Sequence, residues 1–188
     1  MSQQQMSSSS SSSSTALVSG KQRSALLKFL SKAVATQKLA DLQRYITKGG
    51  DTNAIIYQVL GTGRWLTDQA DHTGGEKIGP HPLLAHFCIL DRRAHVMLLL
   101  KNGANVNGRT AGVPPLVAAA GAGHTDLIEI LRVHGAELDQ SDVHSGGTAL
   151  MAACTNNQLA TAQQLVHAGA SVHHVHVPAD ESSWCEAL

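Results

Sequence analysis

The chain has 188 residues, 14 Lys and Arg, 14 Asp and Glu, and a formal net charge of zero. Its apolar runs fall far short of the ~20 residues that a membrane-spanning helix needs, so we expect no membrane segment. Only 3% of the residues are aromatic, which excludes a core built on large rings and is typical of an array of short, Ala- and Leu-rich helices.

Residues 1–20 form a tail in which serine occupies every position from Ser7 to Ser14. Such a low-complexity run cannot bury apolar surface, so we predict that residues 1–20 are disordered. The tail also lacks the apolar stretch of a signal peptide.

Two helices are predicted between residues 21 and 53. Apolar side chains recur at helical intervals over Leu26–Val34, and again at Leu39, Leu42 and Ile46. Residues 21–48 carry seven Lys and Arg against Asp41 alone. This basic segment either meets nucleic acid or an acidic partner, or forms a solvated outer face. No interleaved aromatics support base stacking, so nucleic acid is not the expected partner.

Residues 54–79 are predicted to form a hairpin-like insertion. A β-branched and aromatic run, Ile55–Leu60, is followed by the turn Gly61–Gly63 and a second short run, Arg64–Thr67. Tyr57, Arg64 and Trp65 are residue types that dominate protein interfaces. Two roles for Trp65 remain open: it binds a partner, or it folds back to cover the base of the insertion.

The rest of the chain is repetitive. The dipeptide Gly-Ala recurs at a nearly constant interval, at Gly103-Ala104, Gly135-Ala136 and Gly169-Ala170. We divide this part into repeats at 80–113, 114–147 and 148–188, the last with the start of a further repeat. Aligned on Pro114–Asp139, the copy at His81–Asn107 has one extra residue. In the middle copy Gly135 stands where a helix C-cap needs positive φ, and Asp126 stands in the first turn of a helix.

These copies resemble ankyrin repeats, strongly over residues 81–173 and weakly over 21–53, where "KGGDTN" matches "NGANVN". The resemblance implies an all-α solenoid of about four repeats with β-hairpin fingers, and residues 21–53 as an N-terminal capping repeat. It also implies that His124 braces neighbouring backbone. The family binds other proteins on its concave face. By register, the partner-binding positions are Arg109, Thr110, Val113, Gln140, Asp142 and His144 on the fingers, and Ala122, Thr155 and Asn156 on the inner helices.

No catalytic motif is present, so we expect a non-catalytic scaffold that binds a protein partner and takes no cofactor or small-molecule substrate. His173, His174 and His176, with Cys185, either hold a metal or are plain surface; their spacing matches no structural zinc module, and we assign no metal. Cys88 and Cys154 are expected in the apolar core. Three cysteines make no disulfide framework, which favours the cytoplasm, with the nucleus also open.

The C-terminal end has two features of its own. "CEAL" at 185–188 resembles "GTAL" at 147–150, the opening of another repeat. The alternative function is therefore the targeting or regulatory arm of a longer enzyme or multidomain protein. The last helix pair is expected to leave an apolar face uncovered, which predicts self-association unless Trp184 and Leu188 fold back over it.

Overall fold

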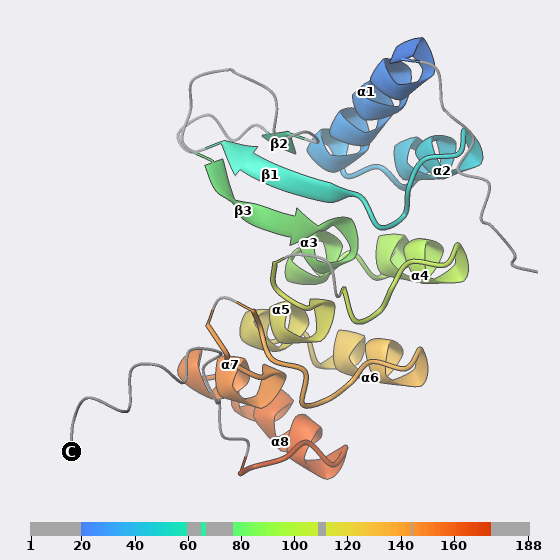
Figure 1. Ribbon diagram of the computed structural model, residues 1–188. Coiled ribbons are helices and arrows are strands. Elements are labelled where there is room, and N and C mark those ends of the chain that lie inside the picture. Colours follow the sequence, from blue (N-terminus) through green and yellow to red (C-terminus); the bar gives the residue numbers. More distant parts are fainter. Residues whose placement is uncertain (1–19, 60–64, 67–76, 109–111, 144, 174–188) are drawn as a thin grey trace, which may run out of the picture.

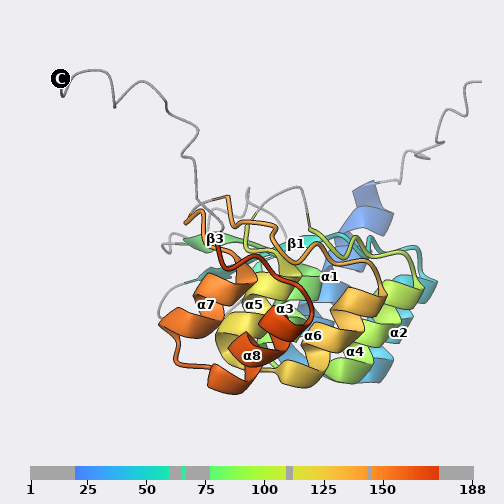
Figure 2. The same ribbon diagram turned by 90° about the horizontal axis from the view of Figure 1, so that it is seen from below.

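The computed structural model describes residues 20–59, 65–66, 77–108, 112–143 and 145–173. Four antiparallel helix pairs stack in chain order, with a small sheet between the first and second pairs (Figures 1 and 2). The elements are α1 (Gly20–Thr36), α2 (Leu39–Thr47), β1 (Ile55–Val59), β2 (Trp65–Leu66), β3 (Lys77–Pro82), α3 (Leu83–Ile89), α4 (Arg93–Lys101), α5 (Pro115–Ala122), α6 (Thr125–Val133), α7 (Ala149–Thr155) and α8 (Leu159–His167).

Each helix pair has the same internal spacing. A left-handed residue follows the first helix of the pair, at Gln37, Asp91, Gly123 and Asn157. A left-handed glycine then follows at an identical sequence separation in every pair, at Gly49, Gly103, Gly135 and Gly169. The prediction of positive φ at Gly135 is confirmed by its φ of +89°. Although residues 21–53 keep this spacing, their role as a capping repeat stays a prediction.

The one extra residue in the copy at His81–Asn107 is His81. Pro82, Pro114 and Thr148 are the N-caps of α3, α5 and α7, and all three precede the left-handed glycine of their pair by the same number of positions. His81 therefore belongs to β3 rather than to the helical repeat.

The inner helices α3, α5 and α7 pack directly on one another. Ala119 and Ala120 of α5 are 0% exposed, because the adjacent inner helices approach closely enough to exclude water. Phe87 takes the place of Ala119 in α3 and is also fully buried. Since α1 packs mainly on α2 and β2, the larger ring lies at the junction with the N-terminal part of the molecule.

Hydrogen bonds between successive loops fix the spacing of the pairs at one end. Asn53 Oδ1 accepts from the backbone N–H of Asn105 at 2.7 Å. The same bond recurs one repeat later, from Glu137 N–H to Asn107 Oδ1 at 2.9 Å. It recurs again from Ser171 N–H to Asp139 Oδ1 at 2.8 Å. A short polar side chain is therefore required at this position, because it satisfies a backbone donor of the next repeat.

The insertion contains the predicted hairpin and a third strand that the sequence analysis did not predict. The sheet order is β2-β1-β3 and both pairings are antiparallel. The sequence of β3, "KIGPHP", did not predict a strand because it contains two prolines, which lack a backbone N–H and are confined to edge strands. Ile56 of β1 is 0% exposed, so the base of the insertion is part of the core.

The N-terminal pair buries Leu30, Val34 and Leu42, as the helical spacing predicts. Leu39, which was assigned to the same face, is 39% exposed, and Tyr45 is buried in α2 instead. The Tyr45 hydroxyl donates to the backbone carbonyl of Asp51 at 2.9 Å. Burial raises the pKa of Tyr45 to about 12.

Replacing Ala119 with arginine tests the inner-helix packing. The side chain has no space, and an unpaired charge there is excluded from water, so Ala119→Arg should lower the free energy of unfolding by about 3 kcal/mol or more. Ala122→Arg, at the half-buried end of the same helix, is the matched control and should change it little. Urea titration measures both, and a stable Ala119→Arg protein would contradict the packing.

Candidate functional site

The ends of the inner helices form a row of equivalent positions. The last two residues before each left-handed turn are Ile89 and Leu90, Gly121 and Ala122, and Thr155 and Asn156. Ile89 is 42% exposed, Ala122 is half-buried, and Thr155 and Asn156 are exposed. These positions remain accessible even though the helices that carry them are packed on their neighbours.

Two of these side chains are held by their own helix. Thr155 Oγ1 donates to the carbonyl of Met151 at 2.9 Å, and Asn156 Nδ2 donates to that of Ala152 at 2.9 Å. At Gly121 an added Cβ would stand 3.3 Å from Asn156 Nδ2. A side chain at Gly121 would therefore crowd Asn156, so this position of the row requires a small residue.

The predicted finger residues are more firmly engaged within the array than the sequence suggests. Val113 is half-buried and packs against the core. Gln140 Nε2 donates to the Asn107 carbonyl at 2.7 Å. Asp142 is 7% exposed and accepts from both the backbone N–H and the hydroxyl of Ser145, at 3.1 and 2.7 Å. Arg109, Thr110 and His144 lie outside the described residues.

Of the insertion residues, Tyr57 is half-buried and its backbone pairs with Leu66. The backbone of Trp65 pairs with Gln58 in the hairpin; its side chain and all of Arg64 lie outside the described part of the chain. The described members of the predicted partner-binding set thus fall into three groups, on the inner helix row, on the fingers and on the insertion.

The turn between paired helices carries a contact to the preceding repeat. His124 Nε2 lies 2.9 Å from the carbonyl oxygen of Ile89, which confirms the predicted bracing role. At the position equivalent to His124 in the second pair, Arg92 Nε donates to Gln37 Oε1 at 3.0 Å. Asp126, in the first turn of α6 as predicted, also pairs with Arg93 of α4.

Three histidines lie at the junction where the insertion meets the array. The ring of His95 stacks on Phe87 with centroids 4.7 Å apart, and His86 meets the same ring edge-on at 5.4 Å. Burial lowers the pKa of His86 to about 4, with a further lowering by His81. Burial also lowers the pKa of His81 and of His95, and Arg92 adds to the effect at His95. The junction therefore favours neutral imidazoles.

In the last described helix pair, α7 and α8, apolar side chains are exposed that are buried at the equivalent positions of the preceding pair. Met151 is 38% exposed, whereas its counterpart Val117 is 7% exposed. Cys154 is exposed, whereas its counterpart Ala120 is fully buried. The prediction of a core position is correct for Cys88, whose thiol pKa is raised by burial, and wrong for Cys154. The helical pattern gives the correct face in both, but only the structure shows that this face of α7 has no following repeat among the described residues.

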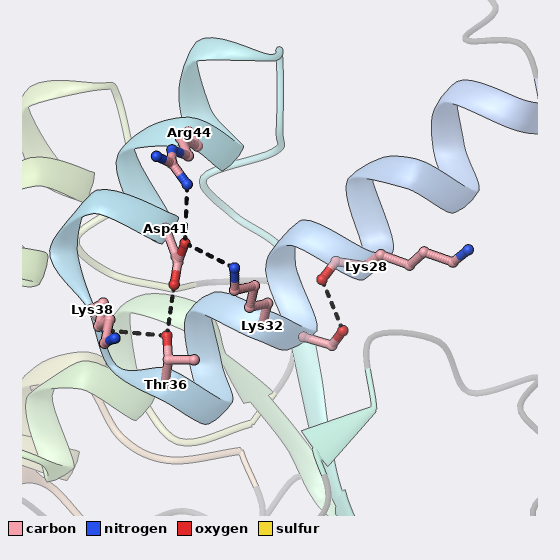
Figure 3. A network of polar contacts seen from close by, with 7 residues as sticks. Lys28, Lys32, Thr36, Lys38, Asp41 and Arg44 are labelled. Carbon is pink, nitrogen blue, oxygen red and sulfur yellow. Dashed lines mark hydrogen bonds and ion pairs between the residues drawn. The ribbon is translucent and has the colours of Figure 1, made fainter.

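The N-terminal helix pair contains a polar network around Asp41 that the sequence analysis did not predict. Asp41 is 6% exposed; its carboxylate accepts from Thr36 Oγ1 at 3.0 Å and lies 3.6 Å from Lys32 Nζ and 3.8 Å from Arg44 Nη1 (Figure 3). The signal available in the sequence was a lone carboxylate in a basic segment, which is expected to lie beside its cations.

The described residues contain no group of three or more His, Cys, Asp or Glu side chains that could hold a metal ion. His173 is exposed, and His174, His176 and Cys185 lie outside the described ranges. Within those same ranges no helix is long and apolar enough to cross a membrane.

Stacked helix pairs of fixed spacing, joined by loop-to-loop hydrogen bonds, define a helical-repeat protein. Residues 85–176 match the family model for ankyrin repeats, in three copies. The chain is an ankyrin-repeat protein, and ankyrin repeats are protein–protein interaction modules that are typically non-catalytic. No curated protein matches the chain.

The buried histidines predict a loss of stability in mild acid. An unfolded histidine has a pKa near 6.5, so between about pH 6.5 and 4 the unfolded chain binds a proton that the folded His86 does not bind. The free energy of unfolding should therefore fall between pH 7 and 5. In His86→Leu this fall should be smaller. His134→Leu, at an exposed histidine, should keep the wild-type difference, and equal pH dependence in all three proteins would contradict the assignment.

Proposed function

We propose that this chain is a non-catalytic scaffold that binds a protein partner through its inner surface, with the finger insertion as a second contact. The observation that supports it best is the row at the ends of α3, α5 and α7. Its residues remain accessible while the helices that carry them are packed on their neighbours. A surface that is already ordered loses little conformational entropy on binding.

The fingers support this proposal because their backbone is held in place by hydrogen bonds within the array. Asp142 and Gln140 hold their loop from within, so that the neighbouring exposed positions, such as Val143 at 79% exposure, are presented on a fixed backbone. The insertion adds Tyr57, Arg64 and Trp65, whose residue types are frequent interface anchors. Ile56 is in the core, so point substitutions test the insertion better than its deletion.

Photo-crosslinking tests the inner surface even while the partner is unidentified. A photo-reactive residue at position 155, at the end of α7, should form a covalent adduct with a protein partner in cells. The same residue at position 133, where Val133 is 69% exposed on the outer helix α6, should form none. For an identified partner, Thr155→Arg should weaken binding by about 2 kcal/mol without changing the melting temperature. Adducts at position 133 alone would contradict the proposal.

A second proposal is self-association through the C-terminal face. A hollow of about 450 Å³ is lined by Leu150, Cys154, Ala162, Gln163, Val166, His167 and Val172. The sequences of α7 and α8, "ALMAACT" and "LATAQQLVH", contain no Asp, Glu, Lys or Arg. Two copies can therefore meet face to face without like-charge repulsion, which makes a symmetric contact available.

Val166→Glu tests this contact, because Val166 lines the hollow and is 46% exposed. We expect the wild-type chain to show concentration-dependent dimerisation in sedimentation, and Val166→Glu to be monomeric because each face then carries a carboxylate. Leu159→Glu is the control: Leu159 is 68% exposed at the start of α8 and does not line the hollow. A wild-type chain that remains monomeric at all concentrations, with Trp184 shielded from a fluorescence quencher, would favour coverage of the face by residues 174–188 and overturn self-association.

A further inference from the structure

Positive charge is concentrated at one end of this neutral chain. Residues 21–48 hold seven Lys and Arg and one Asp, a net of +6. Because the whole chain sums to zero, the remainder carries −6. Such a separation creates an electrostatic field that attracts an acidic partner to the N-terminal helix pair.

The one carboxylate of this segment offsets only part of its positive charge, through ion pairs with Lys32 and Arg44. Asp41 is buried, and its hydrogen bond and ion pairs are all directed into the helix pair (Figure 3). It holds Lys32 of α1 and Arg44 of α2 near one another, while their side chains stay 58% and 66% exposed. Lys28 points away from the network into solvent (Figure 3).

An apolar groove of about 350 Å³ lies on the same helix pair, between α1 and the end of α2. Ala25, Leu26 and Phe29 supply its apolar lining, with Gln22, Lys48 and Gly49 at its margin. The Lys48 ammonium lies 5.1 Å from the centroid of the Phe29 ring, so a cation stands at the edge of an apolar floor.

The helical geometry places further cations beside this groove. Lys28 and Lys32 follow Ala25 at i+3 and i+7, along one edge of the apolar stripe of α1. Lys48, the C-cap of α2, follows Arg44 by four residues, so the two cations lie on the same side of that helix end. Lys48 therefore lines the groove itself, and Lys28, Lys32 and Arg44 lie on the same helix pair.

We propose that this N-terminal face, defined by Lys28, Lys32, Arg44 and Lys48 around the Leu26–Phe29 groove, binds an acidic peptide segment that inserts one apolar side chain. The cations match the carboxylates of the segment, and the groove takes the anchor. The described residues of this face offer a single aromatic ring, already covered by Lys48, which does not favour the successive base stacking of a single-stranded nucleic acid. This site is separate from the inner surface and does not depend on it.

Fluorescence anisotropy of the full chain with a labelled peptide of glutamates around one central phenylalanine tests the proposal. We expect saturable binding that weakens as salt rises, because exposed charges are screened. Lys28→Glu and Lys48→Glu should each weaken it about tenfold by reversing a contacting charge. Lys101→Glu, an exposed lysine of α4, is the matched control and should bind as the wild type does.

Two further arms address the groove and the ligand class. Replacement of the central phenylalanine by alanine in the peptide, or Ala25→Trp in the protein, should weaken binding with no change in melting temperature. The proposal is overturned if the peptide does not bind at low salt, if phenylalanine and alanine peptides bind equally, or if an oligothymidylate of similar charge binds more tightly than the peptide does.

Discussion

Close approach of the inner helices is the constraint on which this molecule depends. Ala119 and Ala120 of α5 are fully buried between α3 and α7, and no larger side chain fits there. A helix pair cannot bury its apolar face alone, so each pair is stabilised by its neighbours. The loop bonds from Asn53, Asn107 and Asp139 hold the same spacing at one end, and the row of exposed helix ends follows from both.

The insertion modifies this regular stacking at one place. Its strand β1 contributes Ile56 to the core, and α1 has β2 and α2, rather than α3, as its principal neighbours. Phe87 and His86 occupy the positions that are alanines in α5 and α7, so larger side chains fill the junction. The same junction is where protonation is disfavoured, and it connects the cationic N-terminal pair to the interaction surface.

The sequence predicted the parts of the fold that depend on local spacing. Helical periodicity located the helix pairs, and Gly135 and His124 took their predicted roles. Properties that depend on neighbours were not predictable: Cys154 and Cys88 occupy equivalent positions, yet only Cys88 is covered. The third strand was hidden by its prolines. Among the predicted binding residues, Asp142 is buried against Ser145, because a register carried over from a family does not say which finger residues hold their own loop.

The helix pairs of this array gain stability from their neighbours in the stack, and the binding surfaces depend on this rigidity. Native-state hydrogen exchange measured at low protein concentration, where copies remain separate, tests this most directly. The amides of α5 and α6, with a pair on both sides, should be the most protected, and those of α7 and α8 should exchange faster. Equal protection of these two pairs would contradict the account, because it would mean that a helix pair is stable without its second neighbour.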